Sequence, residues 1–423
     1  MIELVQSLKE NTKNLWIKSG TEFQENGAHY SLTDQILNEQ KVDDLIHPLI
    51  DKFGKDSSGF QKNKTQIKNE KSEIRKTLLH LLSIFGCTID GPMEERFSEV
   101  TDEFLRKAHE FGPKIPFESV YQALRNVWIM NAIQMCMHRE ICLTPSIFAY
   151  SLLYPYTDNY LDSTTTSRDS KCEFNRRLSR RLQGEKVLPV IENEKYVFDL
   201  IHMIEQDYDR TVYHQVFESL MAIHKAQIRS IGQQTEKHDV GIDELLDITF
   251  EKGGTSVLAD GYLVAGDLRI EDAEFLFQFG AVLQLIDDLQ DILEDSKSHQ
   301  NTVMVAYKNR GKLIEATNRL FSFLENVFSS PYCNKSDQDR RIYDLFERGS
   351  RLMILDSIAS NRKFYQPKYV STLERHSPVR LEYLLRLKKK MKEKLNKSGQ
   401  TEGRLHILFH HSATAPIAVR AAN

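Results

Sequence analysis

Hydrophobic residues recur along most of this chain at intervals of three and four, the spacing that buries one face of an α-helix. The pattern is clearest between Pro189 and Pro331, a stretch with no proline inside it. The alternation of polar and apolar residues that is typical of half-buried strands is absent. The sequence therefore predicts an all-α protein of antiparallel helices with short connections. Between these prolines, helices are predicted at about 193–206, 209–233, 241–265 and 271–296.

The remaining parts of the chain also favour helices. Ahead of a break at Gly112, Pro113 and Pro116, the pattern predicts helices in 1–50, 74–85 and 94–110, with a lysine-rich exposed loop at 51–72. After the break, helices are predicted at 117–138, from Pro145 towards Asp162, at 338–364 and at 379–397. We divide the chain into an N-terminal helical extension packed on the main bundle (1–112), the main helical domain (113–397) and a frayed tail (398–423).

Composition excludes several classes of protein. The 423 residues are 40% hydrophobic, enough for a sizeable core, and a net charge of −4 provides no strong field to attract nucleic acid. The five cysteines lack C-x-x-C spacing, which argues against a zinc site or a disulfide framework and fits a reducing compartment. No apolar run reaches the roughly 18 residues of a membrane span, and residues 1–18 do not resemble a signal peptide. We expect a cytoplasmic protein without a transmembrane segment.

The most informative stretch is 271–295, which is apolar nearly all round and yet carries acids on one face. Gln284, Asp287, Asp288, Asp291 and Asp295 follow at intervals of three and four. A row of carboxylates on a buried helix is costly unless a cation compensates the charge. Oxygen-only ligands suit Mg²⁺, which is usually shared with substrate phosphates. The alternative interpretation is an exposed acidic end of a helix.

This stretch resembles the second metal-binding helix of class I isoprenoid synthases. Gln284-x-x-Asp287-Asp288-x-x-Asp291 resembles the second aspartate-rich motif of trans-prenyltransferases. In another register, Asp287 to Asp295 resembles the Asn/Ser/Glu triad of terpene cyclases, with acids in place of those residues. The family implies a bundle in which a first acidic helix faces this one. Asp158 and Asp162, in Asp-Asn-Tyr-Leu-Asp far upstream, are the candidates for it.

Further elements of the family pattern occur between the two motifs, in the expected order. Gln227 resembles the glutamine on the diphosphate side of prenyltransferases, and Lys252 with Thr255 resembles their Lys-Thr element, whose lysine binds diphosphate. Gly253 and Gly254 predict a local kink where backbone approaches a ligand. A solvated lysine and an ordinary glutamine are the alternatives for the single residues. The resemblance spans about 145–310.

Two departures from the prenyltransferase pattern affect the expected reaction. Asn159 stands where a second adjacent aspartate is usual, and Ser163 to Ser167 stand in place of Arg-Arg-Gly, with Arg168 as the nearest cation. The early Gly-Lys-Arg element that holds isopentenyl diphosphate also has no counterpart. These losses favour an enzyme that ionises one linear prenyl diphosphate and then cyclises the cation or deprotonates it. The D-x-x-x-D form also resembles the large-terpene synthases of bacteria.

The resemblance implies a role for each candidate residue. Three Mg²⁺ ions would be held, together with the substrate diphosphate, by Asp158, Asp162, Asp287, Asp291 and Asp295. Asp288 and Lys252 would join Asp158, Asp162, Asp287 and Asp291 as catalytic groups, and the substrate would contact Gln227, Lys252, Thr255, Gln284, Arg168, Tyr154 and Phe277. Tyr150, Tyr154 and Phe277 are candidates for stabilising the allylic cation, with core packing as the alternative. Gly280 and Ala281 would leave room for the prenyl chain.

Other functions remain open at this stage. A trans-prenyltransferase would elongate an allylic diphosphate with isopentenyl diphosphate, and a head-to-head enzyme of the squalene or phytoene type would join two identical substrates. A non-catalytic helical protein could bind a partner through the basic segment 379–397, although a solvated face explains that segment more simply. A homodimer is possible because relatives often form one.

Overall fold

The computed structural model describes residues 1–25, 27–55, 76–77, 79–88, 91–113, 115–163, 165–235, 241–334 and 336–397. All regular secondary structure in these ranges is helical, which confirms the all-α prediction. The α-helices are α1 (Ile2–Lys18), α2 (Leu32–Lys55), α4 (Gly91–Phe111), α5 (Phe117–Cys136), α6 (Pro145–Asp162), α7 (Arg168–Leu182), α8 (Glu192–Asp207), α9 (His214–Thr235), α10 (Ile242–Ala265), α11 (Ile270–Gln290), α12 (Ile292–Lys297), α13 (Val303–Asn309), α14 (Leu313–Phe328), α15 (Asp337–Ser360), α16 (Pro367–Glu374) and α17 (Leu381–Lys397). Two 3₁₀ turns span Pro331–Asn334 and Arg362–Phe364.

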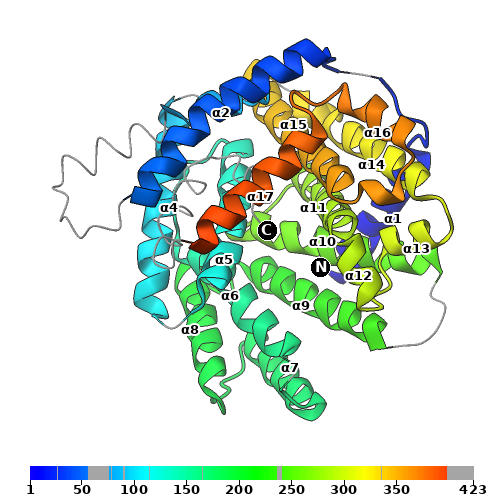
Figure 1. Cartoon of the computed structure of the whole chain (residues 1–423). Coiled ribbons are helices and arrows are strands. Elements are labelled where there is room, and N and C mark those ends of the chain that lie inside the picture. Colours follow the sequence, from blue (N-terminus) through cyan, green and yellow to red (C-terminus); the bar gives the residue numbers. More distant parts are fainter. Residues whose placement is uncertain are drawn as a thin grey trace.

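Helices α10 and α11 form the centre of the bundle, and α1, α5, α9, α14 and α15 pack around them (Figure 1). The pair is antiparallel and unusually close, because Gly253 of α10 faces Gly280 of α11. A Cβ added at Gly280 would lie 2.1 Å from the Gly253 carbonyl oxygen, and one at Gly254 would lie 2.5 Å from the Phe277 ring. These glycines therefore serve helix packing. Helix α10 runs unbroken through both positions, where a kink was predicted, and the space at Gly280 is filled by Gly253.

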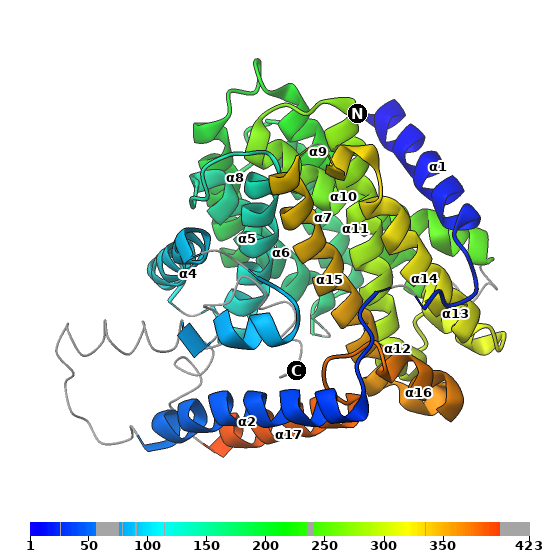
Figure 2. The same ribbon diagram turned by 90° about the horizontal axis from the view of Figure 1, so that it is seen from above.

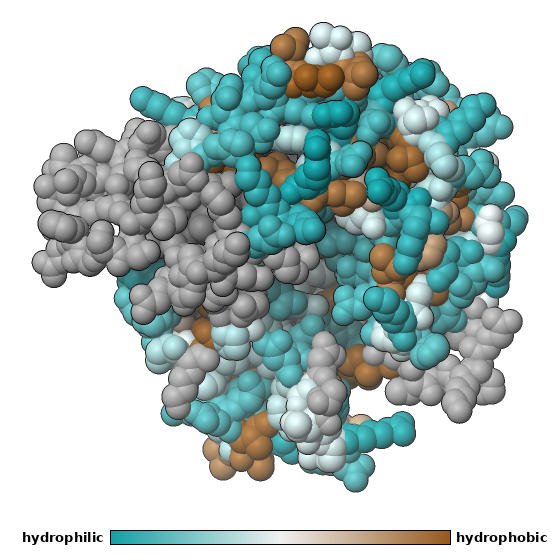
Figure 3. Space-filling model, in the orientation of Figure 1, coloured by the Kyte–Doolittle hydropathy of each residue, from teal (hydrophilic) through white to brown (hydrophobic). Residues whose placement is uncertain are grey.

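The first helix belongs to the main hydrophobic core. Trp16 of α1 is fully buried and makes edge-on contacts with Phe250 and Phe323, at ring-centroid distances of 6.2 and 5.6 Å. By contrast, α2 lies beside α17 in an outer layer (Figure 2), where Val42, Ile46, Val379 and Tyr383 form a small core of their own. The face seen in Figure 3 is mostly hydrophilic, with small apolar areas between the charged side chains.

Several element boundaries differ from the predicted ones. Helix α2 continues to Lys55, so the loop predicted to start at residue 51 begins later, and Pro155 lies inside α6 without ending it. The predicted helix 271–296 is two helices, separated at Asp291. Helices α7, α13, α14 and α16 were not predicted. Residues 56–72 of the predicted loop and the predicted tail 398–423 lie outside the described residues. No helix in the described ranges is long and apolar enough to cross a membrane.

Candidate metal and diphosphate site

The acidic end of α11 faces a cavity of about 140 Å³ together with the lysine of α10. Gln284, Asp287 and Asp288 come from the last turns of α11, Asp291 from its C-cap and Asp295 from α12. Lys252 reaches the same cavity from α10. The structure thus brings together six residues that the sequence nominated: Lys252, Gln284, Asp287, Asp288, Asp291 and Asp295.

The position of these acids on the helix makes their charge costly. The C-terminus of an α-helix carries partial negative charge, so carboxylates in its last turn are disfavoured and cations are favoured. The helix ends here because the Asn361 amide donates hydrogen bonds to the carbonyls of Leu289 and Gln290, at 3.0 and 3.1 Å. Lys252 supplies one compensating charge within the cavity. The remaining carboxylates favour a further cation.

Two of these carboxyl groups, those of Asp288 and Asp295, have raised pKa values. Burial raises the pKa of Asp288 to about 7, and the charge of Asp287 adds to the rise, although the Gln284 amide donates a hydrogen bond to Asp288 at 3.0 Å. Burial likewise raises the pKa of Asp295 to about 6, against a 3.2 Å hydrogen bond from Thr302. Carboxyl groups that hold protons near neutral pH can release them when a divalent cation binds.

Tyr154 links the first acidic helix to the second. Its hydroxyl is hydrogen-bonded to Asp158, one turn further along α6. Burial raises the pKa of Tyr154 well above its usual value, and the charges of both Asp158 and Asp287 raise it further. The charges of one carboxylate on α6 and one on α11 thus both act on this hydroxyl. Asp158 is half-buried and does not line the small cavity itself. The side chain of Asp162 lies outside the described part of the structure.

Two candidate substrate contacts are instead packing residues. Phe277 was assigned to the substrate, and the structure places it fully buried against Gly254 between α10 and α11. Thr255 is 1% exposed, and its hydroxyl donates to the Glu251 carbonyl oxygen of its own helix at 2.6 Å. That hydroxyl is therefore engaged away from the cavity.

Gln227 and Arg168 are also absent from the residues that line the cavity. Ser230, three residues after Gln227 on α9, lines it instead. Arg168 is the exposed first residue of α7. Sequence reasoning also missed several polar residues at the cavity, of which Thr249 lies one turn before Lys252 and could have been found from helical spacing. The missed lining residues are Ser230, Ile248, Thr249, Gln300, Asn301 and Thr302.

The donor set fits magnesium. Carboxylate, hydroxyl and amide oxygens line the cavity, and these are the hard ligands that Mg²⁺ prefers. No three His, Cys, Asp or Glu side chains in the described ranges converge closely enough to form a complete cage. Magnesium is commonly held by one or two carboxylates together with substrate phosphates. The arrangement is thus compatible with an ion whose coordination a phosphate ligand completes.

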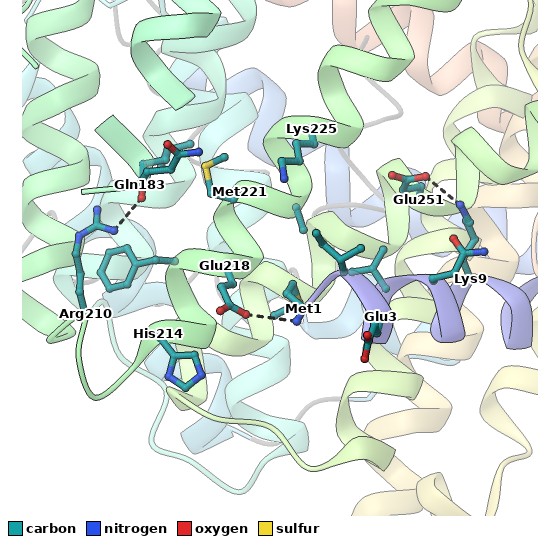
Figure 4. A pocket seen from close by; sticks show the side chains of 16 residues that line it. Met1, Glu3, Lys9, Gln183, Arg210, His214, Glu218, Met221, Lys225 and Glu251 are labelled. Carbon is teal, nitrogen blue, oxygen red and sulfur yellow. Dashed lines mark hydrogen bonds and ion pairs between the residues drawn. The ribbon is translucent and has the colours of Figure 1, made fainter. Parts of the chain in front are cut away.

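A larger cavity of about 830 Å³ lies between α1 and α9 (Figure 4). Both acidic and basic side chains line this cavity, and some of them form ion pairs with each other. Lys9 binds Glu251 at 3.2 Å, and the Arg210 guanidinium stacks on Phe217 with its Cζ 3.8 Å from the ring centroid. This cavity lacks a row of carboxylates on one helix, so the smaller cavity is the better candidate for metal chemistry.

Comparison with known proteins adds no assignment. No protein-family model, no curated protein sequence and no solved structure matches this chain. The candidate site is therefore defined by its own residues. Lys252 and a run of carboxylates line one cavity. The charges of Asp158 on α6 and Asp287 on α11 both act on Tyr154 of α6.

Proposed function

We propose that the protein is a Mg²⁺-dependent terpene synthase with a class I isoprenoid synthase-like bundle. It ionises one linear allylic prenyl diphosphate, releases diphosphate, and quenches the carbocation by cyclisation or deprotonation. The observation that carries the proposal is that Lys252 of α10 lies among the carboxylates of α11 and α12 at one cavity.

The residues have distinct roles in this reaction. Asp158 on α6 and Asp287, Asp291 and Asp295 on the opposite side would hold the ions, with Asp162 as the further ligand that the resemblance implies. Bound Mg²⁺ would neutralise negative charge on the diphosphate as its bond to the allylic carbon breaks. Lys252 binds the same diphosphate through its ammonium group. Asp288 is buried and accepts a hydrogen bond from the Gln284 amide, which orients Gln284.

Tyr154 is suited to the hydrocarbon end of the substrate. Tyr154 is 36% exposed as a whole residue, although burial of its hydroxyl group raises its pKa. An aromatic face beside the departing diphosphate can stabilise the allylic cation. The same ring shields that cation from water, which would otherwise trap it. We further propose that the reaction takes place in the cytoplasm, where linear prenyl diphosphates are soluble as anions.

The test is an incubation of the purified protein with linear prenyl diphosphates of increasing chain length. Each substrate is supplied with Mg²⁺ or with a chelator, and with or without isopentenyl diphosphate. Diphosphate release and extracted hydrocarbons are measured together. A Mg²⁺-dependent hydrocarbon or alcohol from a single allylic substrate supports the proposal. A longer diphosphate that forms only with isopentenyl diphosphate would make the protein a prenyltransferase, and no turnover of any substrate would refute an enzymatic role in this chemistry.

A further inference from the structure

The larger cavity between α1 and α9 has no role in the proposed reaction, and it shares no lining residue with the acidic cavity. Its volume of about 830 Å³ falls within the range of roughly 300–1,000 Å³ that is typical of small-molecule sites. The first turns of α1, the first half of α9 and the end of α7 bound it (Figure 4). Its size and composition make this cavity a candidate for a second ligand site.

Helix α9 presents to this cavity an apolar stripe that ends in a cation. Phe217, Met221 and Lys225 follow at intervals of four residues, and all three line the cavity. Residues spaced in this way lie on one face of a helix, so the stripe extends over about 12 Å between its first and last Cα atoms. Helix α1 adds Val5 and Ile2, and Ile2 is 77% exposed. An elongated apolar molecule would fit along this stripe and cover that exposed side chain.

The ammonium group of Lys225 is available to a ligand. Across the part of the chain that the structure describes, no carboxylate or hydrogen-bond acceptor contacts it. Figure 4 shows this ammonium directed into the cavity. Glu251 lines the same cavity but is already paired with Lys9 at 3.2 Å and with Arg229, one turn beyond Lys225 on α9. This end of the cavity therefore carries more positive than negative charge.

The other charged side chains of the lining have partners or point elsewhere. Glu218 pairs with the N-terminal amine at 3.4 Å, and Arg210 pairs with Glu205 at 2.7 Å. Glu3 is exposed, and its carboxylate is directed away from Lys225 (Figure 4). Among the described residues of this lining, Lys225 is thus the cation without an acidic partner.

We propose that this cavity binds an anionic amphiphile, a single apolar chain that ends in a phosphate group. The chain would lie along Phe217 and Met221 and cover Ile2, and the phosphate would meet the Lys225 ammonium. A lysine ammonium is a compact charge with three donors and a common ligand of phosphate. A neutral or cationic amphiphile would leave this charge unpaired. The proposal does not depend on the proposed function, because the two cavities have no residue in common.

The test measures binding of decyl phosphate by calorimetry, below the concentration at which this amphiphile forms micelles. A chelator is present so that a Mg²⁺-dependent site does not take the phosphate group. We expect saturable binding to the wild type and binding about fivefold to tenfold weaker to Lys225→Gln. Met221→Ser should weaken binding by about fivefold, because it removes apolar surface from the stripe. Lys195→Gln removes an exposed lysine of α8 outside this lining and should bind as the wild type does.

The charge of the head group separates a specific site from general apolar binding. Decyltrimethylammonium has the same chain and a positive head, so it should bind at least about tenfold more weakly than decyl phosphate. Equal affinity for the two amphiphiles would overturn the proposal, and so would the absence of saturable decyl phosphate binding to the wild type.

A second measurement uses the unmodified protein and is independent of how the variants fold. Acetic anhydride labels accessible lysines, and mass spectrometry identifies the sites. Decyl phosphate should protect Lys225 from the reagent and leave Lys195 reactive. Unchanged affinity in folded Lys225→Gln, or equal acetylation of Lys225 with and without decyl phosphate, would refute the role of this residue. The proposed function would stand or fall separately, since its test requires Mg²⁺ and the acidic cavity.

Discussion

Replacement of Gly280 by alanine should separate the two central helices. The added Cβ would lie 2.1 Å from the Gly253 carbonyl oxygen, 2.8 Å from the Gly253 carbonyl carbon and 3.1 Å from the Gly254 Cα. All three atoms belong to the backbone, so no side-chain rotation can relieve the clash. An ordinary contact begins at 3.4 Å. Helices α10 and α11 must therefore move apart by more than an ångström at this level.

The expected cost follows from two opposing effects. Overpacking of a core commonly costs about 1–3 kcal/mol, and a gap of up to 1 Å along the interface forfeits roughly a quarter to a half of the dispersion energy of the contacts it opens. Alanine has a higher helix propensity than glycine by about 1 kcal/mol, which offsets part of the loss. Because the opened interface includes large buried residues such as Phe277, we expect a net loss of about 2 kcal/mol or more in the free energy of unfolding.

The assay is urea unfolding followed by far-UV circular dichroism, with Gly91→Ala as the control. Gly91 is the first residue of α4, and a Cβ there would meet no atom within 4 Å. We expect a lower unfolding midpoint for Gly280→Ala and an unchanged or slightly higher one for Gly91→Ala. Gly280→Ala should also weaken pyrophosphate binding, since Lys252 and Gln284 flank the opened contact. A Gly280→Ala protein as stable as the wild type would refute the close packing of α10 and α11.

Three further substitutions test the energetics elsewhere in the bundle. Burial raises the pKa of Asp260 well above its usual value, so the folded protein retains this proton while the unfolded chain loses it above about pH 4. Relative to Asp260→Asn, the wild type should lose up to about 1.4 kcal/mol per pH unit from there towards the folded pKa, as measured by unfolding midpoints against pH. For Glu205, hydrogen bonds from Arg181 and Arg210 outweigh burial and lower the pKa to about 2, so its stabilisation is complete above the unfolded pKa and disappears as pH falls from about 4 through 2. Because solvent screens this partly buried pair, Glu205→Gln should cost about 1–2 kcal/mol at pH 7 and much less at pH 2, and an equal cost at both would contradict the ion pair. Trp16→Ala should cost about 3–5 kcal/mol in thermal or urea unfolding, because the fully buried ring packs on two phenylalanines of the core.

The sequence predicted correctly those features that depend on the spacing of residues close together along the chain. Helical periodicity of three and four predicted both the all-α class and the shared face of Gln284, Asp287, Asp288 and Asp291. This face lines one cavity in the structure. Local spacing could not show where α11 ends, because the break at Asp291 is stabilised by Asn361, a residue far along the chain.

Contacts between helices account for the predictions that were corrected. Gly253 and Gly280 are distant in sequence, and only their packing explains why both are glycine and why Phe277 is covered. The cavity residues Gln300, Asn301 and Thr302 follow α12 in a connection without periodicity, so no pattern identified them.

The central claim is that α6 and α11 supply opposite sides of one Mg²⁺-dependent diphosphate site. The most direct test measures diphosphate release from the preferred prenyl diphosphate by Asp158→Asn and Asp287→Asn, with Asp243→Asn as the control. Asp243 is an exposed acid that pairs with Lys13 on the surface. We expect each of the first two substitutions to reduce release by at least about a hundredfold without unfolding the protein, and the control to retain full activity. Full diphosphate release by folded Asp158→Asn or Asp287→Asn would contradict the two-sided site.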